Sequence, residues 1–157
     1  MKIDKKLLAK SIALPVLVGV VSGLLTRNAM QDFEVLNQPP LSPPGWLFPV
    51  VWTILYVLMG ISAYLIKTSD ADEQEKADAL TLYYYQLLVN FLWPVFFFNF
   101  GWYLFAFAWL ILLWVLVALM IRQFDKINKA AAYLNLPYLV WLTFAAYLNF
   151  AIWWLNR

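Results

Sequence analysis

The chain has 157 residues, of which 64% are hydrophobic and only 13% are charged. A soluble domain usually has about 45–50% apolar and about 25% charged residues, so this composition excludes an ordinary soluble protein. Cysteine and histidine are absent, which excludes thiol nucleophiles and Cys or His metal sites, so we expect no metal and no resident cofactor. The net charge of +2 is small and dispersed, whereas nucleic-acid binding needs a concentrated basic face, so no nucleic-acid partner is expected.

Stretches of sequence without charge locate the predicted membrane spans. A charged side chain at the bilayer centre costs roughly 3 kcal/mol, and a spanning helix needs about 20 mainly apolar residues. The uncharged stretch between Asp78 and Arg122 holds two spans, and three others hold one each. We predict an all-α fold, a polytopic membrane protein whose single domain over residues 1–157 is a bundle of five transmembrane helices. The spans are predicted at 7–25, 45–66, 80–98, 102–121 and 135–156.

The first span contains Gly19 and Gly23, a pair of small residues four positions apart. Such a pair lets another helix approach closely, and we favour a packing notch within the chain over a dimer face. No small-residue cleavage site follows this apolar run, so we interpret it as a span rather than as a cleaved signal.

The connections between spans differ in composition. Four prolines within residues 39–44 prevent a helix there, so residues 27–44 are predicted to form a stiff loop that acts as a lid or brace. Residues 68–79 are acidic and are predicted to be an aqueous loop rather than a cation site. Residues 99–101 allow only a tight hairpin between two spans, and residues 122–129 are predicted to be a basic loop.

Basic residues are distributed unequally between the two sides of the predicted bundle. Of the 11 Lys and Arg residues, nine lie in the N-terminal segment and in the second and fourth connections. The positive-inside rule therefore predicts a cytoplasmic N-terminus, an outer C-terminus and an outer proline-rich loop.

Tryptophan is abundant, with 9 residues. Four lie at predicted outer helix ends, where an amphipathic ring prefers the headgroup level: Trp46, Trp102, Trp153 and Trp154. Five others lie well inside their spans, where either helix packing or a ligand pocket explains them: Trp52, Trp93, Trp109, Trp114 and Trp141.

Uncharged polar residues in the spans favour a pocket. Four residues of the third span recur at helical spacing on one face: Gln86, Asn90, Trp93 and Phe97. The fifth span adds Trp141, Ala145, Leu148 and Asn149, and the second adds Trp52 and Tyr56. A cavity lined by flat aromatic rings and a few amides suits a large, planar, mostly apolar ligand with some polar edges. Alternatively, Gln86, Asn90 and Asn149 hydrogen-bond one another between helices, and the sequence leaves both interpretations open.

Two segments of the chain resemble a known family. The run Pro39–Trp46, followed by Phe48–Tyr56 and by Met59 and Gly60, is similar to the signature of the TspO/MBR family, the translocator proteins or tryptophan-rich sensory proteins. The third and fifth spans resemble the same family at Tyr83, Gln86, Leu87, Asn90, Trp93, Phe97 and Phe98, and at Pro137, Tyr138, Trp141, Phe144, Ala145, Leu148, Asn149, Trp153 and Asn156.

The resemblance implies a five-helix membrane protein, commonly a homodimer, whose first loop covers a ligand pocket. The implied ligands are porphyrins, haem-like tetrapyrroles and synthetic compounds of benzodiazepine or isoquinoline type. The family's pocket tryptophans carry over onto Trp52 and Trp141, and its third-helix asparagine onto Asn90. With the covering loop, the expected ligand-binding residues are Pro43, Pro44, Trp52, Tyr56, Gln86, Asn90, Trp93, Phe97, Trp141, Ala145, Leu148 and Asn149. The expected location is a bacterial cell membrane.

Two departures from the family pattern concern ligand choice. Glu34 follows Phe33 where the family often has an aromatic pair, and Gln38 precedes Pro39 where it often has lysine, so the loop is expected to hold an acidic ligand edge less well.

The sterol pattern of animal members is also incomplete, because Phe150 and Trp154 replace its tyrosine and arginine. Sterol is therefore not an expected partner. Lys129, Tyr133 and Leu136 fit a reversed sterol pattern, but such patterns are weakly specific.

Three functions remain open from the sequence. The first is a receptor or carrier of tetrapyrroles, and the second is an enzyme that degrades bound porphyrin in light, with Trp52 and Trp141 as redox partners. The third is a regulatory membrane partner in a stress response. The chain has no acid–base pair or nucleophile constellation, which favours a non-catalytic receptor, although photochemistry requires neither.

Overall fold

Helices make up the regular structure of residues 2–157, the part of the chain that the computed structural model describes. The five long helices are α1 (Lys5–Thr26), α3 (Leu47–Lys67), α4 (Glu73–Pro94), α5 (Tyr103–Asp125) and α7 (Leu136–Asn156). Three short elements join them: α2 (Met30–Glu34), the π-helical turn η1 (Val95–Asn99) and α6 (Lys129–Tyr133). Five helical segments are long and apolar enough to cross a membrane, which confirms the predicted all-α class and the number of spans.

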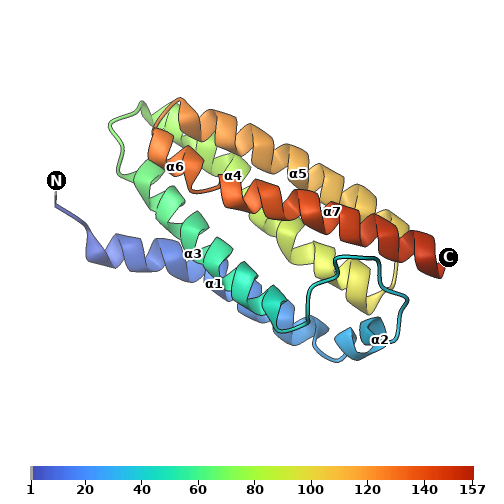
Figure 1. The fold of residues 1–157 in the computed structure, drawn as a ribbon. Coiled ribbons are helices and arrows are strands. Elements are labelled where there is room, and N and C mark those ends of the chain that lie inside the picture. Colours follow the sequence, from blue (N-terminus) through green and yellow to red (C-terminus); the bar gives the residue numbers. More distant parts are fainter. Residues whose placement is uncertain (1) are drawn as a thin grey trace.

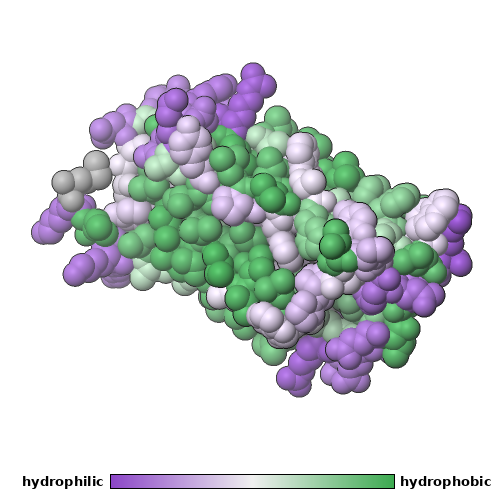
Figure 2. Space-filling model, viewed as in Figure 1, coloured by the Kyte–Doolittle hydropathy of each residue, from purple (hydrophilic) through white to green (hydrophobic). Residues whose placement is uncertain are grey.

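The long helices lie side by side along one axis (Figure 1). The N-terminus and α6 lie at one end of the bundle, and α2 and the C-terminus lie at the other. Helix α1 packs against α3 and α4, while α5 packs against α4 and α7. Figure 2 shows an apolar surface across the middle of the molecule and hydrophilic residues at both ends. This distribution suits a bilayer, because helices satisfy their backbone hydrogen bonds internally and need no water along the span.

Helix α1 turns its small and polar residues inward and its large apolar residues outward. Ser11, Pro15, Ser22 and Thr26 are its buried residues. Helices in lipid gain no hydrophobic effect by associating, so they pack through small residues that allow close contact. Helix α1 lies so close to α3 at Gly60 that a Cβ there would overlap the α1 backbone at Ile12 and Ser11.

The glycine pair of α1 has two different surroundings. A Cβ on Gly19 would overlap the ring of Tyr56, so Gly19 is a packing notch within the chain. A Cβ on Gly23 would meet no atom within 4 Å. Only the first glycine is therefore required by a neighbouring side chain.

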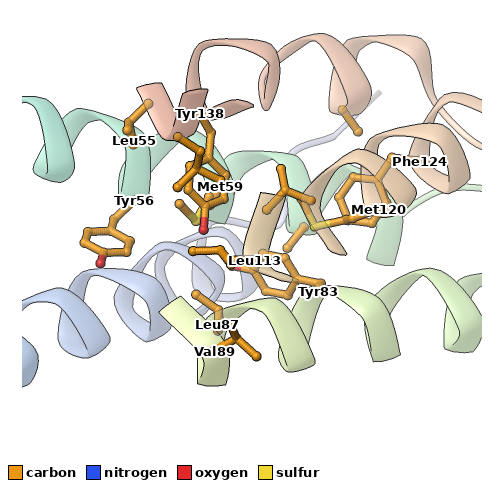
Figure 3. Close-up of a cluster of buried hydrophobic side chains, with 14 of the residues drawn as sticks. Leu55, Tyr56, Met59, Tyr83, Leu87, Val89, Leu113, Met120, Phe124 and Tyr138 are labelled. Carbon is orange, nitrogen blue, oxygen red and sulfur yellow. The ribbon is translucent and has the colours of Figure 1, made fainter. Parts of the chain in front are cut away.

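The main core fills the space between α3, α4, α5 and α7. Figure 3 shows part of it, with Tyr56, Met59 and Tyr83 among the labelled side chains. Met59, Val117 and Met120 are fully buried, at 0% exposure. This close packing supplies dispersion contacts that lipid chains would otherwise make.

The helix ends differ from the predicted loops. Helix α4 begins at Glu73, so the irregular part of the acidic connection is limited to residues 68–72. Glu73 and Glu75 lie in the first turn of α4, where the positive end of the helix dipole stabilises carboxylates. Helix α5 continues to Asp125 and α6 begins at Lys129, so the predicted basic loop is mostly helical as well.

A π-helical turn ends α4 near the cavity described below. Pro94 has no N–H, so the Asn90 carbonyl lacks its usual helical donor. The Phe100 N–H then donates to the Val95 carbonyl at 3.1 Å, which is the wider spacing of a π-helix. Gly101 has φ +65° and reverses the chain into α5, as expected for a tight hairpin.

Candidate functional site

A cavity of about 950 Å³ extends from the first loop toward the middle of the bundle. It is lined by residues of α1, α3, α4, α5 and α7 together with the loop. Ten of the predicted ligand-binding residues line it: Pro43, Trp52, Tyr56, Asn90, Trp93, Phe97, Trp141, Ala145, Leu148 and Asn149. Pro44 and Gln86 do not.

Aromatic rings form two flat walls of the cavity. Trp52 stacks on Tyr56 with ring centroids 5.6 Å apart, and Trp141 meets Trp52 edge-on at 6.5 Å. Trp93 of α4 stacks on Phe97 of η1 at 5.1 Å. Stacked and edge-on pairs hold each other's orientation, so the walls keep their shape without a ligand.

A chain of hydrogen bonds runs from the cavity wall into the core. The Tyr56 hydroxyl donates to Asn90 Oδ1 at 2.7 Å, and Asn90 Nδ2 donates to the Tyr138 hydroxyl at 2.8 Å. The Tyr138 hydroxyl donates in turn to Gln86 Oε1 at 2.7 Å. We call these four residues the polar relay. It joins α3, α4 and α7, and it fixes which way the Asn90 amide points.

Gln86 contributes to the cavity only through the polar relay. Its side chain is 0% exposed, and Tyr138 lies between it and Asn90. The packing interpretation proposed a direct hydrogen bond between the Gln86 and Asn90 amides. The structure instead places the Tyr138 hydroxyl between them. Asn90 lines the cavity and holds two tyrosines at once, and one of its two amide protons has no side-chain partner in the relay.

Asn149 fixes part of the opposite wall. Its Oδ1 accepts from Trp93 Nε1 at 3.0 Å, and its Nδ2 donates to the Tyr103 carbonyl at 2.8 Å. Both ends of the amide are used, so Asn149 orients the Trp93 ring and ties α7 to α5.

The inner tryptophans divide between the cavity and helix packing. Trp109 Nε1 donates to the Val89 carbonyl at 2.8 Å and Trp114 Nε1 donates to Thr143 Oγ1 at 2.9 Å. Neither ring lines the cavity. By contrast, Trp141 lines it, and its Nε1 is buried without a hydrogen-bond partner in residues 2–157. A buried donor without a partner is costly, so this nitrogen lowers the stability of the cavity wall.

The first loop forms the roof of the cavity and is fastened to α7. Asn156 Oδ1 accepts from the Asn37 N–H at 2.9 Å, and Asn156 Nδ2 donates back to the Asn37 carbonyl at 3.0 Å. The Tyr147 hydroxyl donates to the Pro40 carbonyl at 2.7 Å. Helix α2 places Phe33 5.7 Å from Phe97, between ring centroids. These contacts agree with a stiff covering loop.

The cavity carries little charge. Glu34 is the one charged residue among those that line it, and it lies at the roof beside Gln38. The Glu34 side chain is exposed, so its carboxylate stays charged at the roof. A negative charge there disfavours ligands with acidic edges.

The profile of the TspO/MBR family matches residues 11–155. The chain belongs to this family. It is 35% identical to the tryptophan-rich protein TspO of Chlorobaculum tepidum over 95% of each chain. It is 37% identical to the translocator protein of Ovis aries over 80% of this chain and 75% of the sheep protein. It is 36% identical to the tryptophan-rich sensory protein of Cereibacter sphaeroides over 79% of this chain and 76% of that protein.

TspO/MBR membership and the five spans establish an integral, multi-pass membrane protein, and they support a role as a membrane receptor or carrier. Both the family and the aromatic cavity fit an apolar ligand.

Several residues of this TspO-family site were not among the predicted ones. Tyr138, the centre of the polar relay, lies one turn before Trp141 on α7, so the same helical face could have indicated it. Helix α1 adds a set of small and polar lining residues at helical spacing: Gly19, Ser22, Gly23 and Thr26. The sequence shows this spacing, but it does not show which helices or cavity the small face of α1 contacts.

Proposed function

We propose that this TspO-family protein is a membrane receptor or carrier that binds tetrapyrroles, such as protoporphyrin, inside the helix bundle. The observation that carries the proposal is a cavity of about 950 Å³ lined by three tryptophans and almost no charge. Ligand pockets usually measure about 300–1,000 Å³, so this one suits a large ligand. Smaller planar ligands of benzodiazepine or isoquinoline type would occupy part of the same space.

The proposed ligand would stack on the flat walls. Trp52 and Trp141 present ring faces and edges, and Trp93 is held opposite them by Asn149. One donor is available to polar ligand edges, namely the second amide proton of Asn90, which lines the cavity. This combination of large apolar area with a few fixed polar groups is typical of small-molecule sites.

Tryptophan fluorescence tests the proposal directly. Protoporphyrin titrated into the detergent-solubilised protein should quench the fluorescence saturably. Trp52→Leu and Trp141→Leu should each weaken binding by about 0.5–1.5 kcal/mol beyond the lost contact area. The matched control is Trp114→Leu, which removes an equal ring from a site outside the cavity and should leave affinity unchanged. Parental affinity in both cavity variants would refute the proposed site.

A second function is favoured by the arrangement of oxidisable rings beside the cavity. Trp52 lies 5.6 Å from Tyr56 and 6.1 Å from Tyr138, measured between ring centroids. In this alternative, light excites the bound porphyrin, dioxygen oxidises it, and the nearby rings act as redox partners. Illuminating the protoporphyrin complex in air and without oxygen separates the two functions. Oxygen-dependent bleaching that is lost in Trp52→Leu would establish the enzymatic one.

We further propose a homodimer in a bacterial cell membrane, as the resemblance in sequence implies, with a cytoplasmic N-terminus, which the excess of basic residues at the N-terminal end supports. A cysteine placed at Ser42 should be labelled from outside intact cells, and one at Ser69 should not. The reverse labelling would overturn the orientation. The mass of the detergent complex, measured by light scattering, tests the dimer.

A further inference from the structure

A second hollow lies at the end of the bundle opposite the first loop. It measures about 320 Å³ and lies between α5, α6 and the start of α7. We call it the interfacial groove. Its lining residues are Ala118, Ile121, Arg122, Asp125, Lys129, Ala132, Tyr133 and Leu136.

The local sequence explains why the groove exists. Asn128 caps the short helix α6, because its Oδ1 accepts from the Ala131 N–H at 3.0 Å. Ala131 and Ala132 are buried, and their small side chains let α6 lie against the last turns of α5. This fold-back places Lys129 beside the turn of α5 that carries Arg122.

The groove combines a charged side with an apolar side. Arg122 is the first charged residue after an uncharged stretch that begins at Asp78, so it marks the level where α5 leaves the hydrocarbon. Tyr133 is 61% exposed, as is usual for an aromatic ring at the membrane interface. Ile121 and Leu136 line the other side with apolar surface. The groove therefore spans the boundary between headgroups and acyl chains.

The two basic residues of the groove have no partner within the described chain. Elsewhere at this end of the bundle, Lys67 donates to Ser11 Oγ at 3.2 Å, and Lys76 pairs with Glu73 at 3.5 Å. That pair is the one ion pair in residues 2–157. Arg122 and Lys129 make neither kind of contact, so their charges are available to a ligand.

We propose that the interfacial groove binds the headgroup of an anionic phospholipid. The Arg122 guanidinium can donate two parallel hydrogen bonds to a phosphate, and the Lys129 ammonium adds a second positive charge. The Tyr133 hydroxyl supplies a further donor, while Ile121 and Leu136 contact the first part of an acyl chain. Two cations against the Asp125 carboxylate leave the groove positive, which favours a lipid with net negative charge over a zwitterionic one.

Native mass spectrometry of the full-length protein tests this assignment. The protein in detergent is mixed with equal amounts of dioleoyl phosphatidylglycerol and dioleoyl phosphatidylcholine, and the bound lipid is identified. The parent should retain phosphatidylglycerol preferentially. Arg122→Gln and Lys129→Gln should each lower its affinity about fivefold, the loss that corresponds to one basic residue near a membrane surface. Asp125→Asn should raise it.

The matched control is Lys126→Gln, which removes the same charge from the same connection but outside the groove. It should retain the parental preference, and an equal loss in this variant would overturn the site in favour of general charge attraction. Equal retention of phosphatidylcholine, or displacement of the lipid by millimolar inorganic phosphate, would also overturn it. The assignment would also be overturned if cholesterol displaced the bound phosphatidylglycerol and Arg122→Gln left lipid affinity unchanged. Protoporphyrin quenching should be parental in all four variants, because the tetrapyrrole cavity lies at the other end of the bundle, and it reports that they are folded.

Discussion

Replacing Tyr138 by phenylalanine removes a single oxygen atom from the centre of the polar relay. That hydroxyl accepts from Asn90 Nδ2 at 2.8 Å and donates to Gln86 Oε1 at 2.7 Å. Tyr138→Phe therefore breaks two hydrogen bonds while the ring keeps its packing.

The expected cost follows from what the lost hydroxyl leaves behind. Hydrogen bonds between membrane helices average about 0.6 kcal/mol and reach about 1.7 kcal/mol. Gln86 is 0% exposed and keeps a contact with the Met59 sulfur alone, so its oxygen is left buried without a donor. A buried unsatisfied group costs about 1–3 kcal/mol. We expect Tyr138→Phe to lower the free energy of unfolding by about 1–3 kcal/mol.

Two measurements report this change. Thermal unfolding in detergent should show a lower melting temperature, by about 2–4 °C for each kcal/mol. Affinity should fall for protoporphyrin, because the Asn90 amide is no longer fixed by Tyr138, and should hold for a planar ligand without polar edges. Asn90→Leu should show the same selectivity.

The matched control is Tyr85→Phe. Tyr85 also lies on α4, but it is 58% exposed and its hydroxyl has no side-chain partner in the described chain, so its loss should change neither quantity. If Tyr138→Phe has the parental melting temperature and the parental affinity for protoporphyrin, the relay neither stabilises the protein nor orients Asn90. Equal affinity losses for both ligands would refute the orienting role.

Three further predictions concern packing, charge and the roof. Gly60→Ala should destabilise the protein by about 1–3 kcal/mol in thermal unfolding, because a Cβ there collides with the α1 backbone, whereas Gly23→Ala, with open space around it, should not. Glu34→Gln should tighten protoporphyrin about two- to fivefold by removing a carboxylate from the roof, and should leave its dimethyl ester unchanged. Asn156→Ala breaks the reciprocal bonds to Asn37, so stopped-flow fluorescence should show faster porphyrin dissociation; an unchanged rate would contradict a fastened roof.

The spans were predictable because lipid excludes charge so strongly that uncharged stretches mark them. The ends of the helices were not predictable, because hydropathy indicates which residues lie in the hydrocarbon and not where a helix begins or ends. Helix α4 starts outside the apolar stretch, where Glu73 is stabilised by the helix dipole. Helix α2 has only five residues, too few to give a periodic signal.

The candidate site was predictable one helix at a time. Helical spacing in the third span placed Asn90, Trp93 and Phe97 on one face, and they line one cavity. Gln86 shares that face but lies one turn deeper, where Tyr138 fills the space. Which residue of α7 fills it depends on how α7 is rotated against α4, and a single sequence does not encode that rotation. The roof residues before the prolines, such as Phe33 and Gln38, were missed because a five-residue helix and an irregular loop give no periodic signal.

The fastening of the first loop to Asn156 has a consequence for how the protein is made. The loop is synthesised early, between α1 and α3, yet its partner lies in the last turn of α7. During synthesis the first loop therefore has no α7 partner, and the cavity has no fastened roof, until the final helix has entered the bilayer. The fastened roof is therefore a property of the finished chain only.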